Sequence, residues 1–332
     1  MDKFKHLDDI FHHRASHCGF WHGVPHHDAQ KKLFDYFGVK DDFDLCVKLD
    51  ESFHFKGNGS SQYDSQGNGG EFELRSPIPG ADLTDDDVDI IETLNWPKPE
   101  YNNYDSFKSF AERAKPHGIP LIGGAWSSFF TRASAIFGME NYFVKMHTDP
   151  EIVTAVADKI IEYFLGQNQK FIDDCGDLAV GCFFGIDIGT QIDLFVSPEC
   201  FRKFILPYFV KLVENAHKNG KYAFLHSCGS VAKAIPDIIN VAHFDALHPI
   251  QALATGMSAV ELAEKYYDKI VFVGGVDTQV LLREGSPEDI KKEVRRLKGL
   301  FGHNYIMSPS HETIMPDVPP ENVAAMAEAA HE

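Results

Sequence analysis

The sequence has no long hydrophobic run and no closely spaced cysteines. It nowhere reaches the roughly 18 consecutive apolar residues that cross a bilayer, and no apolar run follows its first residues. Its six cysteines are scattered over 332 residues, unlike the dense spacing of a disulfide-stapled secreted module. These absences predict a cytoplasmic protein that has no membrane partner and keeps its thiols reduced.

Basic residues are also scarce, since 31 Lys and Arg stand against 49 Asp and Glu, for a formal net charge of -18. A surface of this sign repels phosphate groups, so we expect no nucleic-acid partner. It also disfavours a polyanionic substrate unless the site itself is locally basic. The many histidines between residues 12 and 27 are interpreted mainly as a solvated tract.

Heptads, internal repeats and an interdomain linker are absent, whereas short apolar runs alternate with longer amphipathic ones. This alternation is typical of repeated βα units, and the length suits an α/β barrel. We predict an α/β fold, a single (β/α)8 TIM barrel that forms one domain over residues 1–332. The eight expected strands cover residues 19–22, 45–53, 119–126, 180–187, 222–227, 244–249, 270–277 and 305–308.

The composition changes to Gly, Ser, Asn and Gln near residues 56–80. We predict an inserted Gly-rich loop there. On a barrel such an insertion often lies over the catalytic face as a lid, although a plain surface loop is an equal alternative.

The most informative motif is His226-Ser227-Cys228-Gly229, at the end of an expected strand. Residues two apart in an extended chain point the same way, so both side chains face one pocket at the carboxyl end of a barrel strand. An imidazole and a thiolate are good zinc ligands, and a catalytic zinc needs a third. His311, after the last strand, is the best-placed candidate. The alternative is a buried Cys that acts as a small hydrophobe beside a core His.

Other polar residues end the neighbouring strands. Asp187 and Gln191 follow one strand, and Asp277 and Gln279 follow another, each pair flanked by Gly. Either Asp can hold a substrate or act as a general acid or base. For Asp277, a turn that caps the next helix explains the pattern equally well.

Three further strand ends complete the predicted pocket. His22, Trp126 and His248 are expected to contact substrate, together with Gln191, Asp277 and Gln279. Asp50 is a candidate catalytic acid, although the direction of its side chain is open.

These motifs resemble the uroporphyrinogen decarboxylase superfamily, which includes cobalamin-dependent methyltransferases. The similarity spans nearly the whole chain and is strongest from Ile119 onward. It rests on residues 138–141, 184–191, 206–208, 225–230, 248–251, 274–279 and 319–322. The resemblance implies a (β/α)8 barrel and, because dimers are common in the family, a homodimer.

The resemblance points to two chemistries. Decarboxylases of this superfamily use no metal and hold a polycarboxylate with an arginine-rich N-terminal motif, but residues 13–21 lack the paired arginines. Asp50 looks like their pyrrole-binding Asp, and His311 like their late His. The methyltransferases resemble the chain through His226 and Cys228, which match their zinc-binding His-x-Cys. Their second Cys is replaced here by Ser310-His311.

The combined interpretation is methyl transfer to or from a small molecule. Zinc held by His226, Cys228 and His311 would activate a thiol acceptor or a methyl donor, with Asp187 and His311 as catalytic groups and a corrinoid protein docking at the barrel mouth. A metal-free decarboxylase that uses Asp50 and His311 is the first alternative. A ligand-binding barrel without catalysis is the second.

Overall fold

The computed structural model describes residues 2–57, 82–94, 96–101 and 105–332. The predicted Gly-rich loop near residues 56–80 therefore lies outside the described residues, except for its first two, which belong to a strand. Whether it covers the catalytic face stays a prediction.

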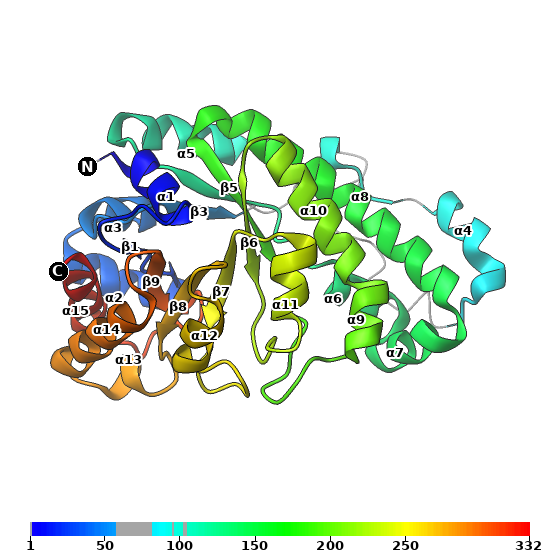
Figure 1. Ribbon diagram of the computed structural model, residues 1–332. Coiled ribbons are helices and arrows are strands. Elements are labelled where there is room, and N and C mark those ends of the chain that lie inside the picture. Colours follow the sequence, from blue (N-terminus) through cyan, green and yellow to red (C-terminus); the bar gives the residue numbers. More distant parts are fainter. Residues whose placement is uncertain (1, 58–81, 95, 102–104) are drawn as a thin grey trace.

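Eight parallel strands form one curled sheet in the order β1-β9-β8-β7-β6-β5-β4-β3 (Figure 1). Its end strands β1 and β3 are joined through Ser52, whose amide donates to Phe20 O at 2.9 Å. The predicted (β/α)8 barrel is thereby confirmed. The strands are β1 (Gly19–Phe20), β3 (His54–Gly57), β4 (Leu121–Gly124), β5 (Ala179–Gly185), β6 (Tyr222–His226), β7 (Ala246–Ile250), β8 (Val271–Val276) and β9 (Tyr305–Pro309).

Helices surround the sheet, with α8 and α10 beside β5 and β6, and α14 beside β8 and β9 (Figure 1). None of the helices among the described residues is both long and apolar enough to cross a membrane. The helices are α1 (Lys3–Phe11), α2 (His27–Phe37), α3 (Asp42–Lys48), α4 (Val88–Thr93), α5 (Asp105–Ala114), α6 (Phe129–Phe137), α7 (Met139–Thr148), α8 (Pro150–Cys175), α9 (Pro198–Phe204), α10 (Leu206–Lys218), α11 (Ile235–Asp237), α12 (Ala259–Tyr266), α13 (Leu281–Glu284), α14 (Pro287–Phe301) and α15 (Pro320–His331).

A second, two-stranded sheet joins the segments that follow β1 and β9. Its strands are β2 (Val24–Pro25) and β10 (Thr313–Ile314), and they run parallel. The sequence did not predict this sheet. It ties the chain after His22 to the chain after Glu312.

Alternation along the strands decides which side chains enter the barrel. On β6, Phe224 belongs to the interior cluster and Leu225 packs in the layer under the helices, so His226 again points inward. The same alternation on β7 places His248 inside. The interior cluster consists of Leu7, Ile10, Trp21, Phe53, Ile122, Phe183, Phe224, Ala246, Val271, Val273 and Ile306.

Helix α1 closes the amino-terminal end of the barrel. Leu7 and Ile10 pack into the interior cluster, and Phe11 stacks on Tyr222, the first residue of β6, with ring centroids 4.0 Å apart. Tyr222 also donates from its hydroxyl to Asp8 at 2.9 Å. The interior is therefore filled at this end, and the opposite end, where the strands finish, is left for chemistry.

The strand predicted at residues 45–53 is wrong, because residues 42–48 form helix α3 and the strand begins at His54. The side chain of Asp41 accepts from the Asp44 amide at 3.0 Å and caps this helix, and Lys48 lies in its last turn. An N-cap acid and a basic last turn favour a helix over the apolar run alone.

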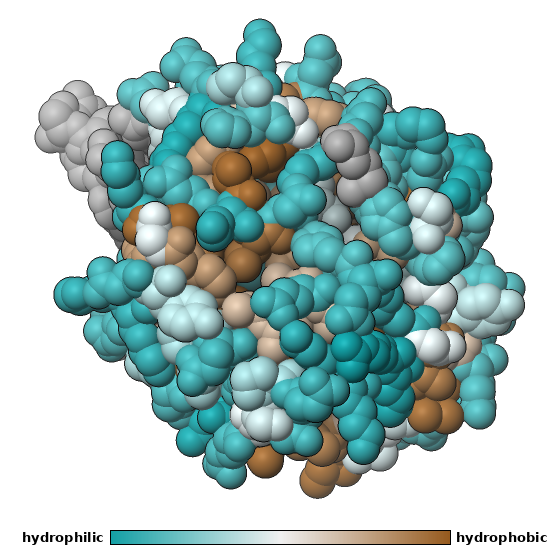
Figure 2. Space-filling view, turned by 90° about the vertical axis from the view of Figure 1, so that its left-hand side faces the viewer, coloured by the Kyte–Doolittle hydropathy of each residue, from teal (hydrophilic) through white to brown (hydrophobic). Residues whose placement is uncertain are grey.

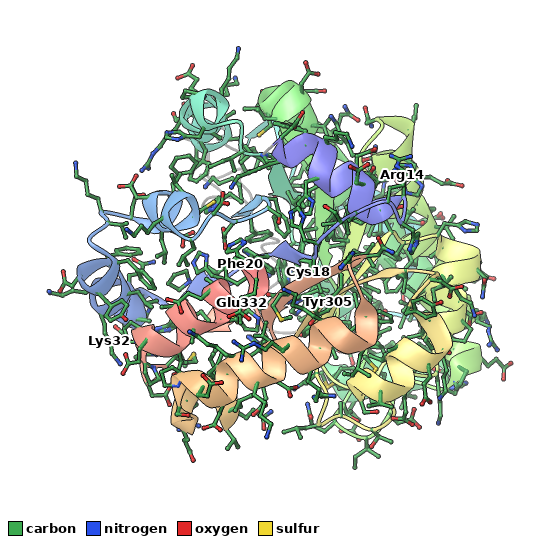
Figure 3. All side chains as sticks on the ribbon, turned by 60° about the vertical axis from the view of Figure 1, so that its left-hand side comes forward. Arg14, Cys18, Phe20, Lys32, Tyr305 and Glu332 are labelled. Atoms are coloured by element: carbon green, nitrogen blue, oxygen red, sulfur yellow. The ribbon has the colours of Figure 1, made fainter. Side chains whose placement is uncertain are left out.

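The C-terminal helix α15 covers β1 and completes the layer at this side. Cys18 donates from its thiol to Ala330 O at 3.6 Å, and the rings of Phe20 and His331 are 5.5 Å apart. Figure 3 shows Cys18, Phe20 and Tyr305 gathered where β1 meets β9, with Glu332 near them. Figure 2 shows a face at this side of the molecule, which hydrophilic side chains mostly cover, with smaller apolar areas between them.

An ion pair near the amino ends of the strands gives a pH-dependent prediction. His217 Nε2 lies 2.8 Å from Asp245 Oδ2, and this hydrogen bond raises the pKa of His217. A raised folded pKa stabilises the protein fully below the unfolded value of about 6.5, and the stabilisation disappears as pH rises through the folded pKa. We expect His217→Gln to cost about 0.2–1 kcal/mol at pH near 5.5 and almost nothing at pH near 9 in urea unfolding. A cost that does not change with pH would contradict this origin.

Candidate functional site

The site is built around the end of β6. His226, the last residue of the strand, is buried with its Nε2 3.5 Å from Cys228 Sγ. The chain then turns at Gly229, where φ is +81° and a Cβ would lie 2.5 Å from Thr190 O. Only glycine fits this close approach of two strand-end loops. The predicted convergence of His226 and Cys228 on one pocket is thus seen in the structure.

Asp187, two residues after β5, contacts both of them. Its Oδ1 accepts from the Cys228 amide at 2.8 Å and lies 3.6 Å from His226 Nε2. One donor atom from each of Asp187, His226 and Cys228 lies within 4.8 Å of the others. This first group combines nitrogen, sulfur and oxygen donors, which suits a zinc-class divalent ion.

His311 and Glu312, after β9, form a second group with Cys228. His311 Nδ1 lies 3.2 Å from Glu312 Oε2 and 3.1 Å from the Thr313 amide. The same carboxylate oxygen is 3.6 Å from His226 Nδ1 and, among the described residues, lacks a hydrogen-bond partner. The three predicted metal ligands are therefore divided between two groups that share Cys228.

Glu312 was not among the predicted site residues. Its only sequence signal is its position directly after His311 at a strand end. The two-stranded sheet of β2 and β10 fixes this segment, because Val24 donates its amide to Glu312 O at 2.6 Å. Gln251 was also missed, and its Oε1 accepts from the Gly229 amide at 2.6 Å and holds the turn after Cys228.

His248 contacts His226 and orients it, and whether it also contacts a substrate stays a prediction. It is fully buried on β7, and its Nδ1 is 2.8 Å from His226 Nδ1. In the tautomer with the proton on His226 Nδ1, this proton is donated to His248 Nδ1 and the Nε2 lone pair faces Cys228. Metal-binding histidines in proteins are commonly held in this way through their second nitrogen.

Trp126 forms one wall of the site. Its ring centroid lies 4.8 Å from that of His226 and 5.7 Å from that of Phe183. The indole has room only because residue 185 is glycine, where a Cβ would be 1.7 Å from Trp126 Cε2. The predicted substrate-binding Trp126 thus borders the candidate site.

Burial decides the protonation states of the central groups. It lowers the pKa of His226 to about 4, with Glu312 acting in the opposite direction, and it lowers the pKa of His248 well below its usual value. Burial also raises the pKa of the Cys228 thiol, and the carboxylates of Asp187 and Glu312 raise it further. At neutral pH the two imidazoles are neutral and Cys228 is a thiol.

Asp277, Gln279 and Gln191 have more peripheral positions. Both oxygens of Asp277 accept backbone amides just before α13, including Val280 N at 2.8 Å, so this residue holds the turn that leads into the helix, which favours the alternative that the sequence left open. Gln279 and Gln191 are exposed on the strand-end loops.

His22 and Asp50 are not brought to this site. His22 is buried against Glu51 and Asp42, and because the preceding Trp21 belongs to the interior cluster, His22 lies on the outer side of the sheet. Asp50 requires a correction, since it lies in a turn with φ of 53°, is largely exposed and pairs with Lys3 of α1 at 2.9 Å. That turn is at the closed end of the barrel, and it buries Glu51 against His22 in place of Asp50.

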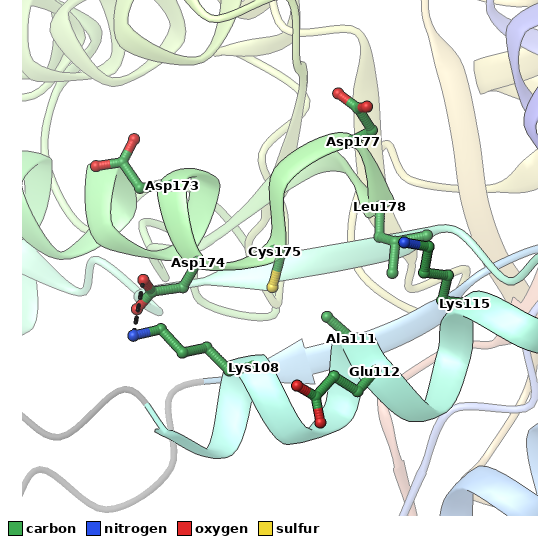
Figure 4. A pocket seen from close by; sticks show the side chains of 9 residues that line it. All are labelled: Lys108, Ala111, Glu112, Lys115, Asp173, Asp174, Cys175, Asp177 and Leu178. Carbon is green, nitrogen blue, oxygen red and sulfur yellow. Dashed lines mark ion pairs between the residues drawn. The ribbon is translucent and has the colours of Figure 1, made fainter.

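A surface pocket of about 430 Å³ lies between α5 and the end of α8 (Figure 4). The Lys108 ammonium group lies 3.5 Å from Asp174 at its edge. Its lining includes Asp177 and Leu178, which directly precede β5. The pocket is therefore at the amino ends of the strands, opposite the candidate site.

Known proteins resemble this chain in both sequence and fold. Methylcobamide:CoM methyltransferase MtbA of Methanosarcina acetivorans is 22% identical over 180 residues, which cover 54% of this chain and 49% of the relative. Uroporphyrinogen decarboxylase of Acidiphilium cryptum is 27% identical over 224 residues, covering 64% and 57%. The chain thus spans about half the length of these relatives. The decarboxylase of Dichelobacter nodosus is 29% identical over 254 residues, covering 73% and 68%.

A solved methyltransferase structure from Methanosarcina mazei has the same fold, with a TM-score of 0.66 at 15% identity over 99% of this chain and 98% of its own. The family model of uroporphyrinogen decarboxylase (URO-D) matches residues 81–332, well over half of the chain. The expected family is thus confirmed, and the chain belongs to the uroporphyrinogen decarboxylase (URO-D) family.

Proposed function

We propose that this protein is an enzyme that transfers a methyl group from a corrinoid, carried by a partner protein, to a small thiol, with zinc at the barrel mouth. The observation that carries the proposal is the 3.5 Å approach of His226 Nε2 to Cys228 Sγ, next to the carboxylate of Asp187. Methyltransferases that act on methylcobamide and coenzyme M are among the relatives, by name.

The residues present fit a zinc ion. His226, Cys228 and Asp187 would hold it, because their donor atoms lie within 4.8 Å of one another and His248 occupies the second nitrogen of His226. His311, the third ligand expected from the sequence, instead shares a group with Glu312 on the other side of Cys228. When bound, zinc lowers the pKa of a coordinated thiol so that it is deprotonated near neutral pH.

His311 and Glu312 are suited to take the proton of the thiol substrate. His311 Nδ1 accepts from the Thr313 amide at 3.1 Å and lies 3.2 Å from Glu312 Oε2, so this nitrogen takes up the proton by exchanging the amide for the carboxylate, which stabilises the resulting cation. The substrate sulfur then attacks the methyl carbon. A carbon–sulfur bond forms, and the electron pair of the broken carbon–cobalt bond stays with the corrinoid substrate. Trp126 shields the buried His226 from water.

Decarboxylation of a polycarboxylate is the second candidate, because two of the relatives are uroporphyrinogen decarboxylases by name. The carboxylates of Asp187 and Glu312 border the candidate site and would repel such a substrate. This charge favours methyl transfer over decarboxylation.

Activity assays separate the two reactions. We expect protein incubated with zinc, methylcobalamin and small thiols, coenzyme M among them, to form the methyl thioether and to release no CO2 from uroporphyrinogen. CO2 release without thioether formation would favour the decarboxylase.

The His311→Gln variant tests the proposed proton acceptor. We expect it to keep its zinc and to lose activity by roughly 10²-fold, because general base catalysis typically contributes at least that much. The loss should be smaller for thiols of low pKa, which need less help to ionise. An equal loss for all thiols would point to a binding role.

A further inference from the structure

A further cluster of residues of metal-binding types, distinct from the two groups at the barrel mouth, lies outside the barrel where the two end strands of the sheet meet. We call it the seam cluster. It combines one residue after β1, two on α3, one in the turn before β3 and one on β3, namely His22, Asp42, Cys46, Glu51 and His54. Because Phe53 and Phe55 pack with the interior cluster, His54 between them points outward toward α3 and α5. The seam cluster is therefore separate from the site at the barrel mouth.

Three donors of the seam cluster are arranged around one point. Cys46 Sγ, a carboxylate oxygen of Glu51 and a ring nitrogen of His54 lie within 4.8 Å of one another, and all three residues are buried. His54 Nδ1 is 4.0 Å from Glu51 Oε2. Two ligands at about 2 Å from a tetrahedral zinc are separated by roughly 3.3–3.8 Å, so a small contraction suffices to bind one ion.

Buried polar atoms of the seam cluster lack the hydrogen bonds that such atoms normally have. Among the described residues, no hydrogen-bond partner exists for Glu51 Oε2, His54 Nδ1, Asp42 Oδ1 or His22 Nε2. Two of these, Glu51 Oε2 and His54 Nδ1, belong to groups that face the common point. Buried polar groups without partners are rare in native proteins, and a bound ion is one of the explanations.

The remaining contacts orient these donors. Glu51 Oε1 is hydrogen-bonded to the Nδ1 atom of His22, which fixes the carboxylate. His54 Nε2 lies 3.5 Å from Asp42 Oδ2, so its Nδ1 is left to act as a ligand. The ring of Phe110 stacks on His54 with centroids 4.8 Å apart and supplies an apolar wall.

We propose that the seam cluster binds a structural divalent ion of the zinc class through Cys46 Sγ, Glu51 Oε2 and His54 Nδ1. Asp42 is not one of these ligands, because its carboxylate faces His54 Nε2 at 3.5 Å and His22 Nε2 at 3.3 Å and orients both rings from the far side. Binding forms a sulfur–metal bond with the electron pair of the Cys46 thiolate, and the thiol proton passes to solvent, with no change of oxidation state.

Such an ion would strengthen the contact between β1 and β3, the two end strands of the sheet. Between β1 and β3, the Ser52 amide bond to Phe20 O and the Phe20 amide bond to Ser52 Oγ, at 2.9 and 3.0 Å, replace a regular ladder. The ion links α3 and β3 directly, and His22, after β1, holds the Glu51 ligand. The role is structural, because the donors are buried and the site offers no open face to a substrate.

Metal content of purified, zinc-reconstituted full-length protein tests the proposal. The Cys228→Ala variant, which removes the ligand at the barrel mouth, is expected to keep about one equivalent of zinc in the seam cluster. With Co²⁺ in place of zinc, the same variant should show a thiolate-to-cobalt charge-transfer band. Folded Cys228→Ala protein that binds neither ion would overturn the inference, and this arm leaves the seam cluster intact.

The Cys46→Ala variant should contain about one equivalent less than the wild type, whereas Cys182→Ala, a buried cysteine on β5 outside both groups, should lose none. Wild-type zinc content in Cys46→Ala would also overturn the inference.

The results distinguish failure of the proposed function from failure of the seam-cluster proposal. Unchanged metal content in Cys228→Ala counts against zinc at the barrel mouth, and unchanged content in Cys46→Ala counts against the seam cluster.

Discussion

Replacing Cys228 by Ala is expected to abolish zinc binding at the barrel mouth and to lower methyl transfer to thiols by more than about 10²-fold. Loss of even a supporting contact to a metal ligand typically costs 10–100-fold in metal affinity or activity, and loss of the ligand itself costs more. Cys228 belongs to both donor groups of the site, so no neighbouring side chain can replace it without moving. Thioether formation at saturating zinc measures the effect.

The His226→Gln variant is the companion to this experiment. It keeps a buried polar side chain but removes the imidazole, and it should be as inactive as Cys228→Ala while its far-UV circular dichroism stays that of the wild type. Wild-type turnover in either variant would remove that residue from the mechanism. The Cys200→Ala variant, altered far from both groups on α9, should keep full activity.

Gly185→Ala is expected to displace Trp126 and to destabilise the protein by about 1–3 kcal/mol, the usual cost of forcing extra volume into a packed interior. The added methyl group would lie 1.7 Å from Trp126 Cε2, so the indole must leave its place beside His226. We therefore expect a change in tryptophan fluorescence, a lower midpoint in urea and reduced activity.

Two variants control for this effect. Gly299→Ala, on α14 with nothing within 4 Å of the added atom, should stabilise the protein or leave it unchanged. The double variant Gly185→Ala/Trp126→Ala removes the clash, so it should be less destabilised than the sum of its two single changes. Simple additivity in that pair would show that the methyl group and the indole do not compete for the same space.

The sequence predicted the barrel well where a strand is a short apolar run that ends in Gly, Asp, His or Pro. Six of the expected strands, from residue 119 onward, overlap strands β4 to β9, because strands buried on both faces are apolar throughout. The run at residues 45–53 looked the same in composition. There the cap at Asp41 and the charges of α3 outweigh the apolar content and favour a helix.

The candidate site could be predicted only where the chain is extended. On β6 the two-residue repeat places His226 and Cys228 on one side, as the sequence indicated. In turns the repeat fails, since Asp50 at φ of 53° is largely exposed and the next residue, Glu51, is buried against His22. Likewise, nothing in the sequence says that Glu312 turns toward His226, because the small sheet of β2 and β10 sets the direction of that segment.

Helix α1 closes the amino-terminal end of the barrel, and this affects how substrates enter and products leave. Leu7 and Ile10 fill the amino-terminal opening, so among the described residues the strand ends are the side of the barrel that is left for small molecules to enter and leave. The proposed carrier protein, docked at the strand ends, would enclose any small molecule that had already bound there. In the proposed reaction the small thiol would therefore enter before the carrier docks, and the thioether would leave after the carrier has dissociated.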